Sequence, residues 1–205
     1  MRSFIAIEFP VIVRQEIGQL CELFRKAPAQ DQLQRTVRWV NPENIHLTLR
    51  FLGNTSADQC RELADKLRPI ARAYRPVHLA VGAPGCFPNC RRPRVIWLGL
   101  AGDLVLLRAL QSDIEMAIQQ VGFEAETRAF APHVTVGRVQ RHLDQAKLSV
   151  LASAVAEFVA EFGQTDVGSQ GRSPFVAREL VHMRSQLQPS GPIYTPIGHF
   201  PLGNG

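Results

Sequence analysis

Two segments of this 205-residue chain repeat one pattern: a histidine, an apolar residue, a threonine and a second apolar residue. They are His46-Leu47-Thr48-Leu49 and His133-Val134-Thr135-Val136. Alternation of polar and apolar residues is typical of a β-strand, so each histidine shares a strand face with its threonine while the apolar residues face the core. Because strand, helix and motif recur together, we predict a duplication within one fold.

The remaining hydrophobic pattern predicts strands that alternate with helices along the whole chain. The expected strands cover residues 4–9, 45–52, 77–87, 94–100, 131–139, 175–187 and 193–200. Helices are expected from Pro10, from Ser56 to Pro69 with a capping box between Ser56 and Gln59, from Asp103 to Gly122, and over residues 148–163. Residues 161–173, rich in glycine and polar side chains, match neither a strand nor a loop pattern. No linker or change of composition divides the chain, which favours a single domain over residues 1–205.

The net charge of +5 is concentrated in the first half of the chain. Residues 1–102 carry the basic surplus, and residues 103–205 have a small acidic excess. A one-sided basic surface attracts polyanions, so nucleic acid is a candidate partner, with plain solubility as an equal alternative. No apolar run approaches the roughly 18 residues that a membrane span needs, and the first ten residues do not form a secretory signal. We therefore expect a soluble, cytoplasmic protein that does not bind membranes.

The spacing of the four cysteines does not match a zinc site. They occupy positions 21, 60, 86 and 90, so only Cys86 and Cys90 are close in sequence. A structural zinc usually takes two closely spaced pairs of ligands, and no second pair follows this one. We predict no metal, and thiols that stay reduced inside the cell.

Two histidines that face one site suit acid–base chemistry at phosphorus. An imidazole titrates near neutral pH, so one histidine can accept a proton from the attacking oxygen while the other donates one to the leaving oxygen. Threonine hydroxyls beside them can hydrogen-bond the non-bridging oxygens of a phosphate. For one motif alone, a solvent-facing strand is the better interpretation. The second copy in the same apolar frame favours a site, one whose chemistry requires no metal.

The quoted segments carry a resemblance to a known family. HLTLRFLG and PHVTVGR, with the opening FIAIEFP and the closing ELVHMRSQLQPSGPIYTPIGHFPL, resemble the two-histidine phosphoesterases. Within these the chain is most similar to the RNA 2′,3′-cyclic phosphodiesterases, also called 2′,5′ RNA ligases. The resemblance implies an α+β fold of two pseudo-symmetric lobes, each an antiparallel sheet with outer helices, around a central groove. It implies hydrolysis of RNA 2′,3′-cyclic phosphate ends to 2′-phosphomonoesters, without metal or cofactor.

The resemblance also implies roles for individual residues. His46 corresponds to the proton donor to the leaving O3′, and His133 to the proton acceptor that activates water. Thr48 and Thr135 are then expected to bind the phosphate. Arg138 follows the second motif where the family commonly has an arginine, although strict alternation points it away from His133 and leaves a surface role open.

Other residues are weaker candidates for substrate contacts. Arg50 shares the His46 face by alternation, and an arginine-rich loop could contact an RNA backbone. Four aromatic residues could either stack on a terminal RNA base or lie in the core: Phe4, Phe51, Trp39 and Trp97. The loop arginines are Arg91, Arg92 and Arg94. Four histidines lie outside the motifs: His78, His142, His182 and His199. We expect His182 and His199 to be structural.

The expected partner is an RNA with a 2′,3′-cyclic phosphate end or a small cyclic nucleotide, bound by a monomer. Two alternatives stay open at this point. The same site could use a 5′-hydroxyl in place of water and act as a 2′,5′ RNA ligase. The chain could also be a non-catalytic RNA-binding module that keeps the fold and the basic surface.

Overall fold

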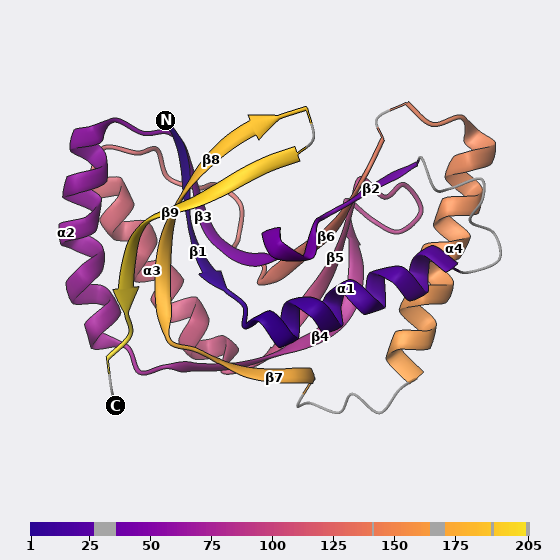
Figure 1. The fold of residues 1–205 in the computed structure, drawn as a ribbon, viewed down its shortest axis with the longest axis horizontal. Coiled ribbons are helices and arrows are strands. Elements are labelled where there is room, and N and C mark those ends of the chain that lie inside the picture. Colours follow the sequence, from indigo (N-terminus) through magenta and orange to yellow (C-terminus); the bar gives the residue numbers. More distant parts are fainter. Residues whose placement is uncertain (27–35, 141, 165–170, 190, 204–205) are drawn as a thin grey trace.

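Two antiparallel sheets form the centre of the molecule in the computed structural model, which describes residues 1–26, 36–140, 142–164, 171–189 and 191–203. The first sheet has the strand order β3 (His46–Asn54), β1 (Arg2–Glu8), β8 (Glu179–Gln188) and β9 (Gly191–Pro201). The second has the order β2 (Val37–Trp39), β6 (His133–Val139), β5 (Val95–Gly102), β4 (Val77–Phe87) and β7 (Arg172–Ala177). Each sheet contains one histidine motif, and the expected α+β fold is confirmed (Figure 1).

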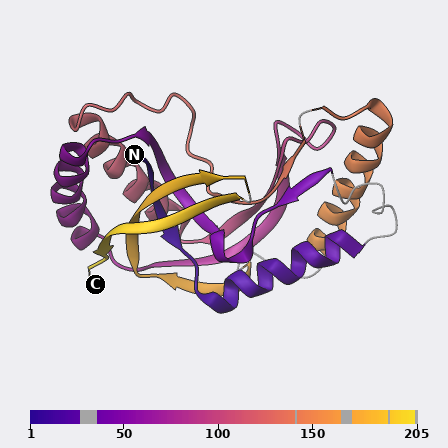
Figure 2. The ribbon, with the colours of Figure 1, turned by 45° about the horizontal axis from the view of Figure 1, so that its top comes forward.

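Two helices each follow a strand of one sheet and contact the other sheet. Helix α1 (Val11–Lys26) follows β1 of the first sheet but contacts β7 of the second. Helix α3 (Leu104–Gln120) follows β5 of the second sheet, packs mainly against α2 (Ala57–Ala73), and contacts β3 of the first sheet as well as β4 of the second. Helices α2 and α4 (Gln145–Gln164) stay with the sheets of their own motif strands. Figures 1 and 2 show the result: α2 and α3 on one side of the molecule, α1 and α4 on the other.

Strand β1 is buried on both faces, which explains its uninterrupted apolar sequence. Ile5 and Ile7 belong to a large core cluster that includes residues of both sheets. Phe4 and Ala6 point to the opposite face, where they form a smaller cluster with Val181 and Met183 of β8. The first sheet therefore has a second apolar surface, and His46 lies on that side.

The predicted strand over residues 175–187 is two strands in different sheets. Strand β7 ends at Ala177 in the second sheet, and β8 begins at Glu179 in the first. Arg178 between them is exposed, whereas Ala177 and Leu180 are buried. Apolar periodicity runs through the junction because each strand buries its own residues, so the sequence shows no break. Of the unassigned segment 161–173, α4 takes the start and β7 the end, and residues 165–170 lie outside the described residues.

Helix α2 begins as predicted and continues past its proline. Ser56 Oγ accepts from the backbone N–H of Gln59, and the Gln59 side chain accepts from the backbone N–H of Ser56, so the capping box is confirmed. Pro69 lies inside the helix instead of ending it. Ala71, in the next turn, is fully buried, and its carbonyl accepts from the Gly203 backbone N–H. These contacts stabilise the last turn of the helix against the cost of about 3 kcal/mol that an interior proline imposes.

The structure also describes all four cysteines, and none of them forms a disulfide. Burial, together with the neighbouring Cys90 thiol, raises the pKa of Cys86 to about 12. Among the described residues, no group of three or more histidine, cysteine or acidic side chains is placed to hold a metal ion. No helix in those residues is long and apolar enough to cross a membrane.

Candidate functional site

The two motif strands contact one another although they belong to different sheets. Each buries its apolar residues and leaves its histidine and threonine half-buried. The predicted alternation of the two motifs is therefore confirmed. Beyond the motifs, however, both strands depart from it.

A bulge in β3 reverses the alternation after the first motif. Thr48 lies opposite Ala6 of β1, whereas Arg50 lies opposite the preceding residue of β1, so Leu49 has no partner in the pairing. Residues directly opposite in an antiparallel pair share a face. Phe51 lies opposite Phe4, which places it on the His46 side, and Arg50 lies on the helix side.

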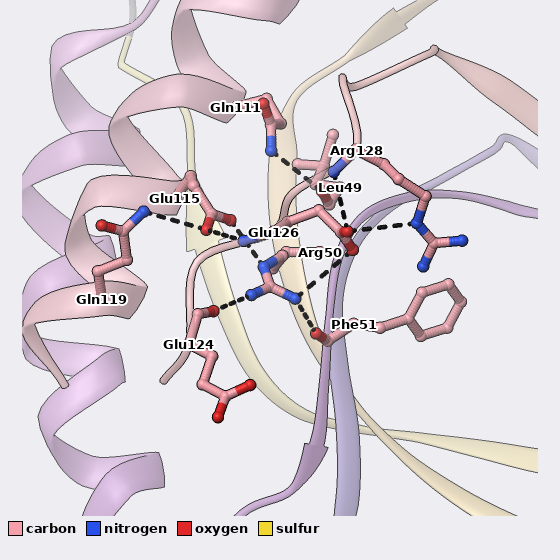
Figure 3. A network of polar contacts seen from close by, with 9 residues as sticks. All are labelled: Leu49, Arg50, Phe51, Gln111, Glu115, Gln119, Glu124, Glu126 and Arg128. Atoms are coloured by element: carbon pink, nitrogen blue, oxygen red, sulfur yellow. Dashed lines mark hydrogen bonds and ion pairs between the residues drawn. The ribbon is translucent and has the colours of Figure 1, made fainter. Parts of the chain in front are cut away.

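The expectation that Arg50 shares the face of His46 is wrong, and its contacts show the reason (Figure 3). Its Nε lies 2.7 Å from a Glu115 carboxylate oxygen of α3, and its Nη2 donates to the Glu124 carbonyl. Burial opposes ionisation of Glu115, but hydrogen bonds from the Glu126 backbone, Gln119 and Arg50 hold its pKa below the usual value. Arg50 therefore ties β3 to α3 and to the segment that follows α3.

Strand β6 has the same bulge at the same place, and it brings Arg138 to the site. Thr135 lies opposite Trp97 and Gly137 lies opposite Ile96, so Val136 has no partner in the pairing with β5. Arg138 then shares the face of His133, contrary to strict alternation. Its positive charge lowers the pKa of His46, in the other motif. The structure therefore brings Arg138 and His46 into one electrostatic environment.

His46 is held by two hydrogen bonds and two aromatic rings. Its Nδ1 lies 2.7 Å from the Asn44 carbonyl oxygen, and its Nε2 lies 3.0 Å from Thr48 Oγ1. Phe4 stacks on the imidazole at 4.8 Å, and Tyr194 of β9 meets it edge-on at 5.1 Å between ring centroids. Burial lowers the pKa of His46, the charge of Arg138 lowers it further, and the hydrogen bond to Asn44 opposes both.

His133 repeats the Nδ1 contact and also has two aromatic neighbours. Its Nδ1 lies 2.7 Å from the carbonyl oxygen of Ala131, which like Asn44 precedes its histidine by two residues. The rings of Phe87 and Trp97 contact the imidazole edge-on, with their centroids 5.0 and 6.1 Å from the imidazole centroid. An Nδ1–H bonded to a carbonyl fixes the tautomer and leaves Nε2 to exchange protons with a ligand.

Two of these aromatic rings escaped the sequence analysis. Tyr194 lies within β9 and Phe87 ends β4, two strands without a motif, and only the fold brings these rings to the histidines. Of the aromatic candidates named from sequence, Phe4 is 1% exposed and Phe51 is 59% exposed. Trp39 is half-buried and packs against the core.

The remaining candidates lie apart from the contacts of the two histidines. Arg94 donates to the Gln140 carbonyl at 3.2 Å, while the backbone N–H groups of Arg91 and Arg92 bond to Asn89. His182 is buried, and burial lowers its pKa to about 4, which suits a structural residue. The His199 side chain is exposed and lies 3.2 Å from a Glu179 carboxylate oxygen.

Comparisons with known proteins agree with this architecture. A family model described as LigT-like phosphoesterase matches residues 12–97 and 104–194. An RNA 2′,3′-cyclic phosphodiesterase of Methanothermobacter thermautotrophicus is 33% identical over 98% of this chain and 99% of its own. One of Methanocaldococcus jannaschii is 27% identical over 96% and 98%. The crystal structure of a Thermus thermophilus protein superposes with a TM-score of 0.72 at 23% identity and covers 100% of this chain and 99% of its own.

Proposed function

Because this chain belongs to the LigT-like phosphoesterase family, we propose that it hydrolyses 2′,3′-cyclic phosphate ends of RNA to 2′-phosphomonoesters. One observation carries the proposal. Two histidines on contacting strands each have Nδ1 hydrogen-bonded to a backbone carbonyl, which leaves Nε2, bonded in His46 to the Thr48 hydroxyl, to exchange protons with a ligand. Relatives that match nearly the whole chain bear the name of this activity. Two imidazoles of this kind supply one base and one acid.

In the proposed reaction, His133 Nε2 takes a proton from water as the water oxygen attacks phosphorus. The bond between phosphorus and O3′ breaks, and His46 Nε2 donates a proton to the leaving O3′. The products are a 2′-phosphate and a free 3′-hydroxyl. The hydroxyls of Thr48 and Thr135 donate to the non-bridging oxygens, and Arg138 supplies positive charge beside them.

His46 can donate only if it is protonated when the substrate is bound. In the free protein, burial and the Arg138 charge hold its pKa below 6.5. A cyclic phosphate is an anion, and when bound beside Arg138 and His46 it offsets the guanidinium charge and favours the imidazolium. Substrate binding and protonation of His46 are therefore coupled. Both proton transfers use histidine, so we propose that the reaction needs no metal.

Hydrolysis of a short RNA with a 2′,3′-cyclic phosphate end, in EDTA, tests the proposal. We expect a 2′-phosphate product from the parent protein and a loss of at least about 100-fold in His46→Ala and in His133→Ala. His78→Ala is the matched control, because His78 is an exposed histidine outside the motifs. If RNA binds but no product forms, the chain is a binding module. If both motif variants keep parental turnover, the catalytic assignment is wrong.

A further inference from the structure

Arg38 of β2 lies directly opposite Arg138 of β6. The pairing of these strands places Val37 opposite Val139, Arg38 opposite Arg138, and Trp39 opposite Gly137. Val37 and Val139 are buried, whereas both arginines are exposed. Since opposed residues share a face, Arg38 lies on the side of the sheet that carries Arg138 and the second motif.

This pairing is unfavourable unless an anion lies near it. Like charges directly opposite each other in a sheet destabilise it. In the described part of the chain, no carboxylate lies within ion-pair distance of Arg38 or Arg138, whereas Arg50, Arg75 and Arg128 each have one. Arg38 donates one long hydrogen bond, 3.5 Å from Nη2 to the Pro189 carbonyl oxygen. Most of its donor capacity therefore remains for a ligand.

The Arg38 side chain reaches the start of β9, the strand that carries Tyr194. Its Nη2 contacts the Pro189 carbonyl and lies so close to Gly191, the first residue of β9, that a Cβ there would be 3.2 Å away. Arg138 lies one strand further into the second sheet, on β6, and its charge lowers the pKa of Tyr194 on β9 and of His46. Arg38 is on β2, the edge strand of that sheet, so a strand spacing of about 5 Å separates the backbones of the two arginines. Arg38 is thus a second cation beside Arg138, on the strand next to the one that carries His133 and Arg138.

We propose that Arg38 binds the phosphodiester that precedes the cyclic phosphate, and thereby selects an RNA chain over a mononucleoside cyclic phosphate. This rests on the proposed function, with the cyclic phosphate between the two histidines. A guanidinium presents paired donors to two phosphate oxygens, and it keeps its charge at any working pH. Arg38 then binds substrate and takes no part in the proton transfers.

Three substrates isolate the predicted contact. The first is a mononucleoside 2′,3′-cyclic phosphate, and the second is a dinucleotide with the same terminal nucleoside. The third is that dinucleotide with a neutral methylphosphonate as its internal linkage. For the parent protein, we expect kcat/KM to be highest with the charged dinucleotide. Arg38→Gln should lower kcat/KM about tenfold for that substrate and leave the other two unchanged.

Salt dependence gives a second readout. With the charged dinucleotide, Arg38→Gln should make the slope of log kcat/KM against log salt shallower by about 0.7, the share of one phosphate contact on a single strand. Arg38→Lys should restore part of the preference. Arg61→Gln on α2 is the matched control, an exposed arginine whose loss should change neither readout.

The outcomes separate this proposal from the function on which it rests. Equal losses on all three substrates would mean that Arg38 supports the site as a whole, and the proposal would be overturned. Unchanged kinetics on the charged dinucleotide would overturn it as well. If the parent protein opens none of the three cyclic phosphates, the proposed function itself is wrong.

Discussion

Arg138 and His46 come from different halves of the chain, yet the charge of one acts on the protonation of the other. The His-x-Thr pattern predicted that each histidine and its threonine share a strand face, and the structure agrees. The electrostatic link could not be predicted, because it depends on which face Arg138 takes. A single unpaired residue, Val136, decides that face.

Replacement of Arg138 tests this link through pH dependence. If His46 is the acid, kcat/KM declines as pH rises through the pKa of His46, which burial and Arg138 hold below 6.5. Arg138→Gln removes the lowering charge, so the decline should move to higher pH even as the maximum falls. Imidazole resonances of the free protein should show the same upward shift. Arg61→Gln should leave both measurements as they are, and a decline that stays in place in Arg138→Gln would contradict the assignment.

At the scale of elements, the two bulges coincide with a change in the spacing of apolar residues along the sequence. Buried apolar residues step by two from Leu47 to Leu49 but by three from Leu49 to Leu52. The second strand repeats this between Val136 and Val139. A step of three interrupts a strict two-residue period, yet apolar residues still recur often enough that each segment matches one continuous strand. The strands were therefore predictable, whereas the reversal of their faces was not.

The bulge in β3 gives Arg50 a structural role that stability measurements can test. Its side chain and that of Glu115 are 12% and 15% exposed, so either charge alone would be poorly solvated. Glu115→Gln should lower the free energy of unfolding by about 2 kcal/mol, measured by urea denaturation. Asp58→Asn is the matched control, because its ion pair with Arg61 is exposed and worth well under about 1 kcal/mol. Equal effects of the two changes would argue against this role for Arg50.

At the scale of the whole molecule, the exchange of α1 and α3 joins the two halves. Periodicity predicted both helices and their apolar faces, since Val13 and Ile17 recur at helical spacing and are buried. It could not say which sheet each helix covers, because an apolar stripe packs equally well on either one. The change of sheet at Arg178 escaped prediction for the same reason.

A core that includes residues of both sheets should unfold as one unit. Trp39 and Trp97 both lie in the second sheet, so tryptophan fluorescence reports on that sheet. Leu63 of α2 is fully buried on the side of the first sheet, and Leu63→Ala should cost about 3 kcal/mol. We expect the fluorescence midpoint in urea to fall together with the circular dichroism midpoint. A fluorescence midpoint that stays at the parental urea concentration would show that the sheets unfold separately.

The matched bulges place different residues five positions after each histidine: Phe51 on one strand and Arg138 on the other. In a perfectly duplicated site, a bound cyclic phosphate could take two orientations of equal energy. Either imidazole could then contact either side of the cyclic phosphate. Because the guanidinium of Arg138 lies on one strand and the phenyl ring of Phe51 on the other, the two orientations differ in energy. The two motifs supply the pair of imidazoles, and the difference at this one position gives the proposed site a direction in which a cyclic phosphate end would enter.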